Sequence, residues 1–189
     1  MWQVDSSKIT NFNTSKGELQ ALIIFWVLAA GKTAKSAEKI LSLLLPKKDL
    51  PFNQLKHFSQ LKLTTKLKSL GCGCYNNKAK TIHQLVNSNI DLSRCGVDDL
   101  EKIYGIGRKT SRGFILHTRK NAQHGVLDTH ILKFLKEYGA PNVPKSTPSS
   151  KFEYERLEKY FLSICRKNNV SPARFDLKIW NNYSKKEKI

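Results

Sequence analysis

Apolar residues recur at intervals of three and four along most of this 189-residue chain, and this spacing limits the possible folds more than any other feature. The interval matches the α-helix, whose turn of about 3.6 residues then carries one apolar face. No segment alternates apolar and polar residues for long enough to predict a β-strand. The sequence therefore predicts an all-α protein, with helices over residues 17–30, 35–45, 52–70, 76–86, 98–104, 108–119, 129–138, 151–167 and 172–183.

Residues 17–30 are apolar on every side, which predicts a central helix that is buried on all faces. Ser15 is placed to cap this helix, and Gly31 is placed to end or bend it. The longest apolar run of the chain, the ten residues from Ala21 to Ala30, is half of the roughly 20 residues that cross a bilayer. The sequence thus excludes a membrane-spanning protein, and no membrane partner is expected.

Positive charge dominates the chain, because 33 Lys and Arg against 15 Asp and Glu give a net charge of +18. A surplus of this size favours a polyanionic partner, either a nucleic acid or an anionic membrane face. The basic residues concentrate in three segments: residues 56–80 hold six lysines and no acid, residues 101–124 six basic residues and one acid, and residues 178–189 four lysines and one acid. One such run is typical of a solvated face, but three runs interleaved with glycine turns and asparagines favour a surface that follows phosphates. We expect binding to such a surface to weaken steeply as salt is added.

The N-terminus has no basic region followed by an apolar stretch, so no secretory signal is visible. An intracellular location is therefore expected, in the cytoplasm, the nucleoid or the nucleus. The four cysteines are accordingly interpreted as reduced thiols: Cys72, Cys74, Cys95 and Cys165. Cys72-Gly73-Cys74 is too sparse for a zinc site and is interpreted as a turn of small residues. No metal and no cofactor are expected.

A short glycine motif, Gly105-Ile106-Gly107, separates two of the expected helices. Glycine permits a positive φ and removes the side chain that would block a close approach, while Ile106 can pack back between the helices. The backbone N–H groups of the turn, and of the first turn of the next helix, then point outward and form an anion site suited to a DNA phosphate. The same motif also joins helices that have no such function, so it is not decisive alone.

Lys109 follows this motif almost directly, and Asp128 follows Lys109 by 19 positions, where it is placed to cap the next helix. Taken singly, Lys109 could be one more surface lysine and Asp128 a plain N-cap. The amine and the carboxylate, together with the glycine turn, favour a functional site.

The stretch from Leu100 to Thr110, followed by Leu127-Asp128-Thr129-His130, resembles the helix-hairpin-helix DNA glycosylases, the group that contains endonuclease III and the 8-oxoguanine DNA glycosylases. The resemblance covers residues 17–135 and extends more faintly into the C-terminal helices. Many endonuclease III relatives end with four cysteines that hold an iron–sulfur cluster, whereas this chain has only Cys165 after Asp128. This departure is closer to the 8-oxoguanine branches.

The resemblance implies two helical lobes that flank a DNA-binding cleft, one of residues 17–124 with the hairpin and one of residues 1–16 and 125–189. It implies that Lys109 is the nucleophile that attacks the sugar C1′, expels the base, forms a Schiff base and allows strand cleavage by β-elimination. Asp128 is then the catalytic carboxylate, which stabilises cationic character on the sugar. The expected protein is a bifunctional glycosylase and abasic-site lyase of base excision repair. It is expected to act as a monomer on double-stranded DNA with an oxidised base, with 8-oxoguanine favoured over an oxidised pyrimidine.

The resemblance also implies which residues meet the DNA, since residues 75–80 are similar to the segment that enters the gap left by a flipped nucleotide. The expected DNA contacts are Gly105, Ile106, Gly107, Arg108, Thr110, Arg112, Tyr75, Asn76, Asn77 and Lys78. The candidates for the base pocket are Gly31, Lys32 and Trp180, whereas Phe25, Trp26 and Phe175 are interpreted as core. His130 is expected to pack beside the site, and His117 to lie at the surface or near a phosphate.

Two other interpretations stay open. The first is a helix-hairpin-helix protein that binds DNA without catalysis, in which Lys109 is a phosphate contact. The second is a basic protein that coats DNA or RNA without preference for a lesion.

Overall fold

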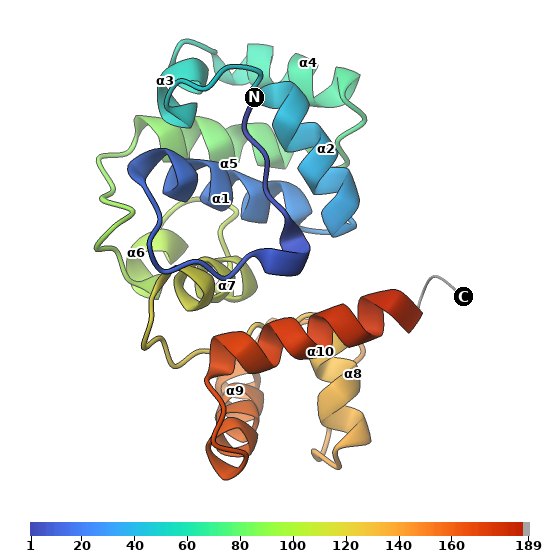
Figure 1. Ribbon diagram of the computed structural model, residues 1–189. Helices are drawn as coiled ribbons and strands as arrows, with labels where there is room; N and C mark the ends of the chain where they lie inside the picture. The colour runs from blue at the N-terminus through green and yellow to red at the C-terminus, as the bar shows by residue number, and fades with distance from the viewer. Residues whose placement is uncertain (187–189) are drawn as a thin grey trace. The chain divides into compact units, whose positions relative to one another are not determined.

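The computed structural model describes residues 1–186, and every regular element in that range is helical (Figure 1). This confirms the all-α prediction. After a short 3-10 turn at Ser6–Lys8, the α-helices in chain order are α1 (Lys16–Ala29), α2 (Ala34–Leu44), α3 (Pro51–Lys56), α4 (Gln60–Ser69), α5 (Tyr75–Asn87), α6 (Val97–Glu101), α7 (Arg108–Thr118), α8 (Thr129–Glu137), α9 (Lys151–Lys167) and α10 (Pro172–Lys186). The end of the basic segment 178–189, from Glu187 onward, lies outside the described residues.

Two helices differ from the sequence prediction in their extent. Residues 52–70, expected as one helix, form α3 and α4, because Ser59 caps α4 by accepting a hydrogen bond from the Lys62 N–H at 3.3 Å. The helix expected over residues 98–104 already ends at Glu101. The residues that follow Glu101 belong to the turn that leads to α7.

Helix α1 is buried along nearly its whole length, as its apolar sequence predicts. A capping box fixes its start: Ser15 N–H donates to the Glu18 carboxylate at 2.7 Å, and Glu18 N–H donates to Ser15 Oγ at 3.3 Å. The hydrogen bonds from the Ser15 backbone and, next, its hydroxyl lower the pKa of Glu18 below its usual value. The helix ends at Ala29, and Gly31 follows with φ at +66°.

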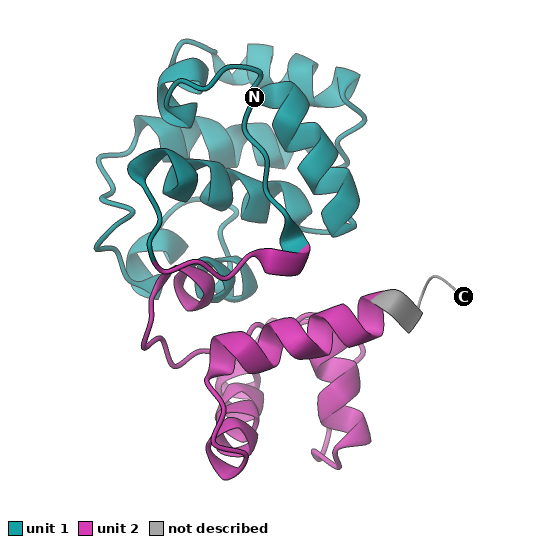
Figure 2. Ribbon diagram, viewed as in Figure 1, with its two compact units in different colours: residues 1–6, 13–114 teal, residues 7–12, 115–189 magenta. Residues whose placement is uncertain are grey.

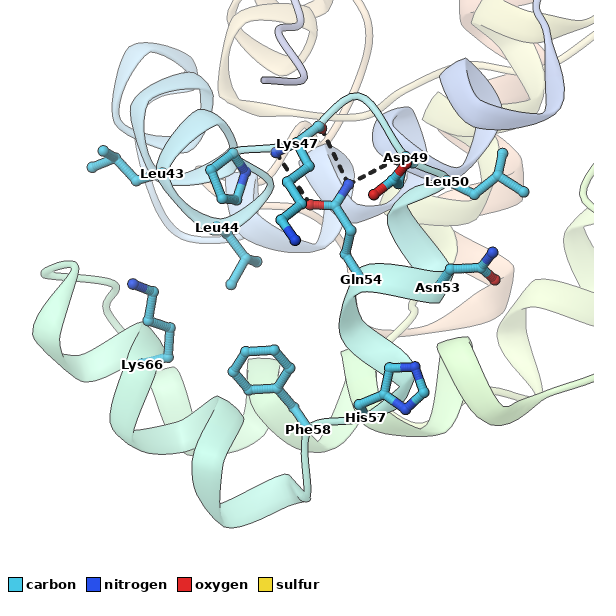
Figure 3. A pocket seen from close by; sticks show the side chains of 11 residues that line it. Leu43, Leu44, Lys47, Asp49, Leu50, Asn53, Gln54, His57, Phe58 and Lys66 are labelled. Carbon is cyan, nitrogen blue, oxygen red and sulfur yellow. Dashed lines mark hydrogen bonds between the residues drawn. The ribbon is translucent and has the colours of Figure 1, made fainter.

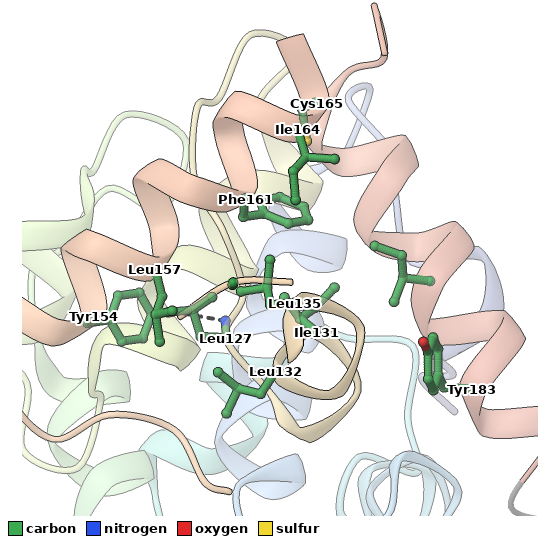
Figure 4. Close-up of a cluster of buried hydrophobic side chains, with 12 residues drawn as sticks. Leu127, Ile131, Leu132, Leu135, Tyr154, Leu157, Phe161, Ile164, Cys165 and Tyr183 are labelled. Carbon is green, nitrogen blue, oxygen red and sulfur yellow. Dashed lines mark hydrogen bonds between the residues drawn. The ribbon is translucent and has the colours of Figure 1, made fainter. Parts of the chain in front are cut away.

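The chain divides into two compact units, and the division falls within α7 (Figure 2). Unit 1 comprises residues 1–6 and 13–114, and unit 2 comprises residues 7–12 and those from 115 onward. In unit 1, α1 packs against α2, α3 and α5. In unit 2, side chains of α8, α9 and α10 form a separate apolar core (Figure 4). The lobes expected from the sequence, residues 17–124 against 1–16 and 125–189, stay a prediction.

No helix among the described residues has an apolar stretch of the length that a membrane crossing requires. All four cysteines are free thiols, of which only Cys74 is exposed. Within residues 1–186, no three His, Cys, Asp or Glu side chains gather as a metal-binding group would.

Candidate active site

The glycine motif forms the turn of a helical hairpin between α6 and α7. Gly105 has φ at +79°, and a Cβ at this position would collide with the Thr81 side chain of α5. Gly107 is not in the left-handed region, and a Cβ there would meet open space. The two glycines therefore serve different ends: Gly105 is required by the fold, whereas Gly107 leaves the outer side of the turn open.

The hairpin presents the start of α7 as expected. Ile106 is only 3% exposed, which confirms that it packs back into the protein. Ser111 N–H donates to Gly107 O at 3.0 Å, so the first helical hydrogen bond of α7 begins at Gly107. The N–H groups of such a first turn have no acceptor within their own helix and favour an anion. Lys109 stands on this turn with a partly buried side chain.

An acidic side chain that sequence analysis missed holds the two helices of the hairpin together. Glu101 of α6 accepts hydrogen bonds from Ser111 Oγ and from Arg112 Nη1, each at 2.7 Å. The Arg112 side chain is only 9% exposed, so its ion pair with Glu101 turns it away from the role of a DNA contact. Thr110 is also buried, which leaves only its backbone for such a contact. The available signal was that Glu101 is the one acid among six basic residues in the segment 101–124.

The hairpin is also attached to α5, which begins with the segment expected to enter the duplex. Tyr104 N–H donates to Gln84 Oε1 at 2.9 Å, and the Tyr104 hydroxyl donates to Asn77 Oδ1 at 3.3 Å. Lys80 Nζ lies 4.0 Å from the centre of the Tyr104 ring. The structure thus brings Asn77 beside the hairpin, with Asn76 exposed and Tyr75 partly buried on the same first turn of α5.

Helix α7 packs closely on α1. A Cβ at Gly113 would lie 2.7 Å from the Trp26 ring, so only glycine allows this approach. Phe25 is buried, as expected, whereas Trp26 is partly exposed where it meets α7. Lys109 lies one helical turn before Gly113 and thus on the same side of α7 as this contact. Arg108 and Lys109 are partly buried, and all the later residues of α7 are buried.

Lys78, expected among the DNA contacts, is directed into the protein. Its side chain is only 5% exposed, and its Nζ donates to the Leu28 carbonyl at 2.7 Å. Burial lowers the pKa of Lys78 below its usual value. The reason for the difference is tertiary, because the acceptor lies 50 residues away in the chain. The two candidates for the base pocket that follow Leu28, Gly31 and Lys32, are both exposed.

In unit 2, Asp128 is the N-cap of α8, as expected. Its Oδ1 accepts hydrogen bonds from the N–H groups of His130 and Ile131, each at 2.9 Å. The side chain is partly buried. Two backbone donors on one oxygen fix the orientation of the carboxylate.

The backbone that leads to Asp128 is held by α9. The fully buried Tyr154 donates its hydroxyl proton to Gly125 O at 2.9 Å and accepts from Leu127 N–H at 3.2 Å (Figure 4). Glu158 accepts from Gly125 N–H at 2.9 Å, and Thr147 Oγ1 donates to Leu127 O at 2.7 Å. Nothing local in the sequence predicted these contacts, which join segments 20 to 33 residues apart.

Trp180 of α10 lies next to the start of α8. Its ring makes an edge contact with the His130 ring at 6.1 Å between centres, so His130 packs beside Asp128 and Trp180 as expected. Phe175 instead stacks on Phe161 in the core of unit 2. His117 was expected at the surface or near a phosphate, and this was wrong: it is 1% exposed. Its ring nitrogens lie 2.7 Å from Thr10 Oγ1 and 3.2 Å from Asp176 Oδ2.

The structure thus brings together two groups of the expected residues, each within its own unit. Unit 1 holds Lys109, the hairpin and the start of α5, and unit 2 holds Asp128, His130 and Trp180. A pocket of 710 Å³ in unit 1 lies between α2, α3 and α4 and is lined by Leu44, Phe58 and Lys66 among others (Figure 3). None of the expected site residues lines this pocket.

Comparisons with known proteins show the family to which the chain belongs. The sequence model of the 8-oxoguanine DNA glycosylase family matches residues 4–170. The crystal structure of the Methanocaldococcus jannaschii 8-oxoguanine DNA glycosylase is similar with a TM-score of 0.70 and 25% identity, over 92% of this chain and 81% of that one. The chain has no match among curated proteins.

Two further structures share the fold. One is the Methanocaldococcus jannaschii 8-oxoguanine glycosylase/lyase in complex with 15mer DNA containing 8-oxoguanine, with a TM-score of 0.68, 24% identity and coverage of 93% of this chain and 85% of that one. The other is Tm1821, the 8-oxoguanine DNA glycosylase of Thermotoga maritima, with a TM-score of 0.69, 22% identity and the same coverage. Since the family match spans most of the sequence, the chain belongs to the 8-oxoguanine DNA glycosylase family.

Proposed function

We propose that this DNA glycosylase of base excision repair removes 8-oxoguanine from double-stranded DNA and then cleaves the strand at the abasic site, with Lys109 as the nucleophile. The observation that carries the proposal is the position of Lys109, on the first turn of α7 and two residues after the open Gly107. The related Methanocaldococcus jannaschii glycosylase/lyase, whose complex contains 8-oxoguanine DNA, supports the substrate and the second activity.

The proposed reaction begins when the neutral Lys109 amine attacks C1′ of the damaged nucleotide. The glycosidic bond between C1′ and the base nitrogen breaks. The base leaves with the bonding electron pair and with one proton from the attacking amine. The bound amine then passes its remaining proton to O4′ as the C1′–O4′ bond breaks and the sugar ring opens, which gives an imine between Nζ and C1′. Loss of a proton from C2′ expels the 3′ phosphate and cleaves the strand.

In this reaction, Asp128 faces the sugar as a carboxylate. Positive character develops at C1′ while the base departs, and a fixed negative charge stabilises that state more than the ground state. The cap on α8 supports this role because it orients the carboxylate before the substrate binds.

The proposed DNA surface consists of exposed and partly buried groups of unit 1. These are the turn at Gly107, the first turn of α7 with Arg108, and the residues Tyr75, Asn76 and Asn77 of α5. Gly31, Lys32 and Trp180 are proposed for the base pocket. The protein is proposed to act as a monomer.

Borohydride trapping tests the proposal, because hydride adds to the imine carbon and leaves a stable amine between protein and DNA. The wild-type protein, incubated with a duplex that holds a single 8-oxoguanine, is expected to form a covalent complex. Lys109→Gln is expected to form none while it retains most of its affinity for the duplex. Lys39→Gln, which removes an exposed lysine of α2, is the matched control and is expected to trap like the wild type.

Each alternative interpretation gives a different result. A protein that only binds DNA shows no trapping with any duplex. A protein that coats nucleic acid shows no preference for the lesion over an undamaged duplex at matched salt. Trapping that survives in Lys109→Gln overturns the role given to Lys109. A panel of duplexes that each hold one oxidised pyrimidine tests the proposed base, which is overturned if one of them reacts faster than the 8-oxoguanine duplex.

A further inference from the structure

Lys78 is a buried cation at the place where α5 meets the end of α1. The side chain is 5% exposed, and its Nζ donates to Leu28 O at 2.7 Å. A lysine is rarely buried to this extent, because its ammonium group loses the hydration that water provides. The contact therefore replaces solvent with one specific backbone carbonyl.

This carbonyl lies at the point where α1 stops. Lys32 N–H, which in a continuing helix would reach back to Leu28 O, instead donates to Ala29 O at 3.1 Å. Carbonyls in the last turn of a helix carry partial negative charge and lack partners within the helix, so a cation here is favoured. Lys78 thus supplies a donor to a carbonyl that borders the turn of residues 29–32.

The same turn connects Lys78 with the groups proposed for catalysis. The pKa of Lys78 is lowered chiefly by burial and also by the positive charges of Lys32 and Lys109. The Lys32 side chain also lies against Gly73, just before α5 begins, because a Cβ at Gly73 would collide with Lys32 Cε. Lys32 and the first turns of α5 therefore share one region of unit 1. Lys78 also follows Asn77 directly, and Asn77 accepts a hydrogen bond from Tyr104 of the hairpin.

We infer that Lys78 is a positioning residue for the damaged base: its hydrogen bond to Leu28 holds the turn of residues 29–32 in the shape that the base pocket needs. The inference rests on the proposed function, because it takes Gly31 and Lys32 as part of that pocket. Gly31 has φ at +66° and open space around it, so the turn has no packed side chain of its own at that residue. The anchor from α5 adds to the two contacts that Lys32 makes, its N–H bond to Ala29 O and the approach of its side chain to Gly73.

Two substrates separate this role from a general structural one. Removal of 8-oxoguanine requires the base pocket, whereas cleavage at a preformed abasic site involves no base. Lys78→Met keeps an unbranched side chain that is only one atom shorter and removes the donor. We expect it to slow excision of 8-oxoguanine by about 10-fold to 100-fold in single-turnover assays, as for other misplaced substrates, while abasic-site cleavage stays close to wild type.

Two further variants complete the design. Lys78→Arg keeps a donor and is expected to recover most of the excision rate. Lys39→Met removes an exposed charge from α2 and is expected to change neither reaction. Thermal unfolding shows whether Lys78→Met folds. If it does not, Lys78→Gln, which has a shorter donor, replaces it and is expected to slow excision to a smaller extent while abasic-site cleavage stays close to wild type.

The outcomes are distinct. Equal loss of both reactions, or no loss of excision, overturns the inference and leaves the proposed function intact. A wild-type protein that is inactive on both substrates overturns the proposed function, and the inference falls with it.

Discussion

The hairpin of unit 1 and the segment that leads to Asp128 in unit 2 are held in place by different means. Side chains fix the hairpin on both sides, since Glu101 joins α6 to α7 and the Tyr104 hydroxyl joins the turn to Asn77 of α5. Only one backbone bond is added at the turn, from Tyr104 N–H to the Gln84 side chain. The segment before Asp128 is fixed through its own backbone, whose N–H and C=O groups bond to Tyr154 and Glu158. The hairpin thereby keeps its outer backbone open, whereas the second segment uses its backbone for its own placement.

The two functional groups differ in the same way. Two backbone donors at 2.9 Å bind Asp128 Oδ1, so the carboxylate has one orientation. Lys109 projects from the first turn of α7 on a flexible stem. In the proposed reaction the carboxylate is therefore the fixed group, and the amine is the group that follows C1′ as the base leaves and the sugar opens.

The largest expected effect comes from removing the fixed charge. Asp128→Asn keeps an oxygen that can accept the two cap hydrogen bonds but loses the negative charge. We expect excision to slow by about 100-fold or more, the usual scale for a group that acts in the transition state. Asp128→Ala also loses the cap, which costs about 1 kcal/mol of unfolding free energy. Single-turnover rates and urea unfolding of both variants measure the two effects, and an Asp128→Asn rate close to wild type would refute the assigned role.

The two hairpin glycines give the next contrast. Gly105→Ala must adopt a positive φ and collide with Thr81, so we expect a loss of about 1–3 kcal/mol in unfolding free energy. Gly107→Ala meets open space in the protein, and its stability is expected to stay near wild type. Its methyl group would lie between the turn and a phosphate, so DNA affinity is expected to fall. Urea unfolding and duplex binding at two salt concentrations test the pair. A Gly107→Ala protein that binds the duplex as tightly as the wild type would mean that the hairpin faces no DNA.

Local features of this chain could be predicted from its sequence. The capping box at Ser15, the N-cap at Asp128 and the inward packing of Ile106 each depend on residues that are neighbours in the chain. The family resemblance was predicted from the hairpin, Lys109 and Asp128, and the match over residues 4–170 confirms it.

The partners of buried polar groups could not be predicted in this way. Lys78 bonds to Leu28 across 50 residues, and His117 bonds to Asp176 across 59. In the sequence, Lys78 and His117 look like ordinary surface residues. The type of a residue does not reveal which distant carbonyl or carboxylate it will bond to. The Glu101–Arg112 pair is nearer in sequence, but its two members lie on different helices.

The smallest expected effect concerns the backbone that holds Asp128, and two cysteines can report it. Tyr154→Phe keeps the ring but leaves Gly125 O and Leu127 N–H without the hydroxyl, which we expect to cost about 1–2 kcal/mol. Burial, followed by the nearby Asp176 charge, raises the pKa of Cys165 to about 12, so at pH 8 this thiol is neutral and buried. It should react with a thiol reagent only when unit 2 opens.

We therefore expect Tyr154→Phe to speed the labelling of Cys165 at pH 8, while labelling of the buried Cys72 in unit 1 stays unchanged. The ratio of the two labelling rates, followed by mass spectrometry, separates loosening of unit 2 from a general loss of stability. A rise in both rates together would mean that the two units open as one. The contrast between a hairpin fixed by side chains and a segment fixed by its backbone would then be a difference in construction without a difference in local stability.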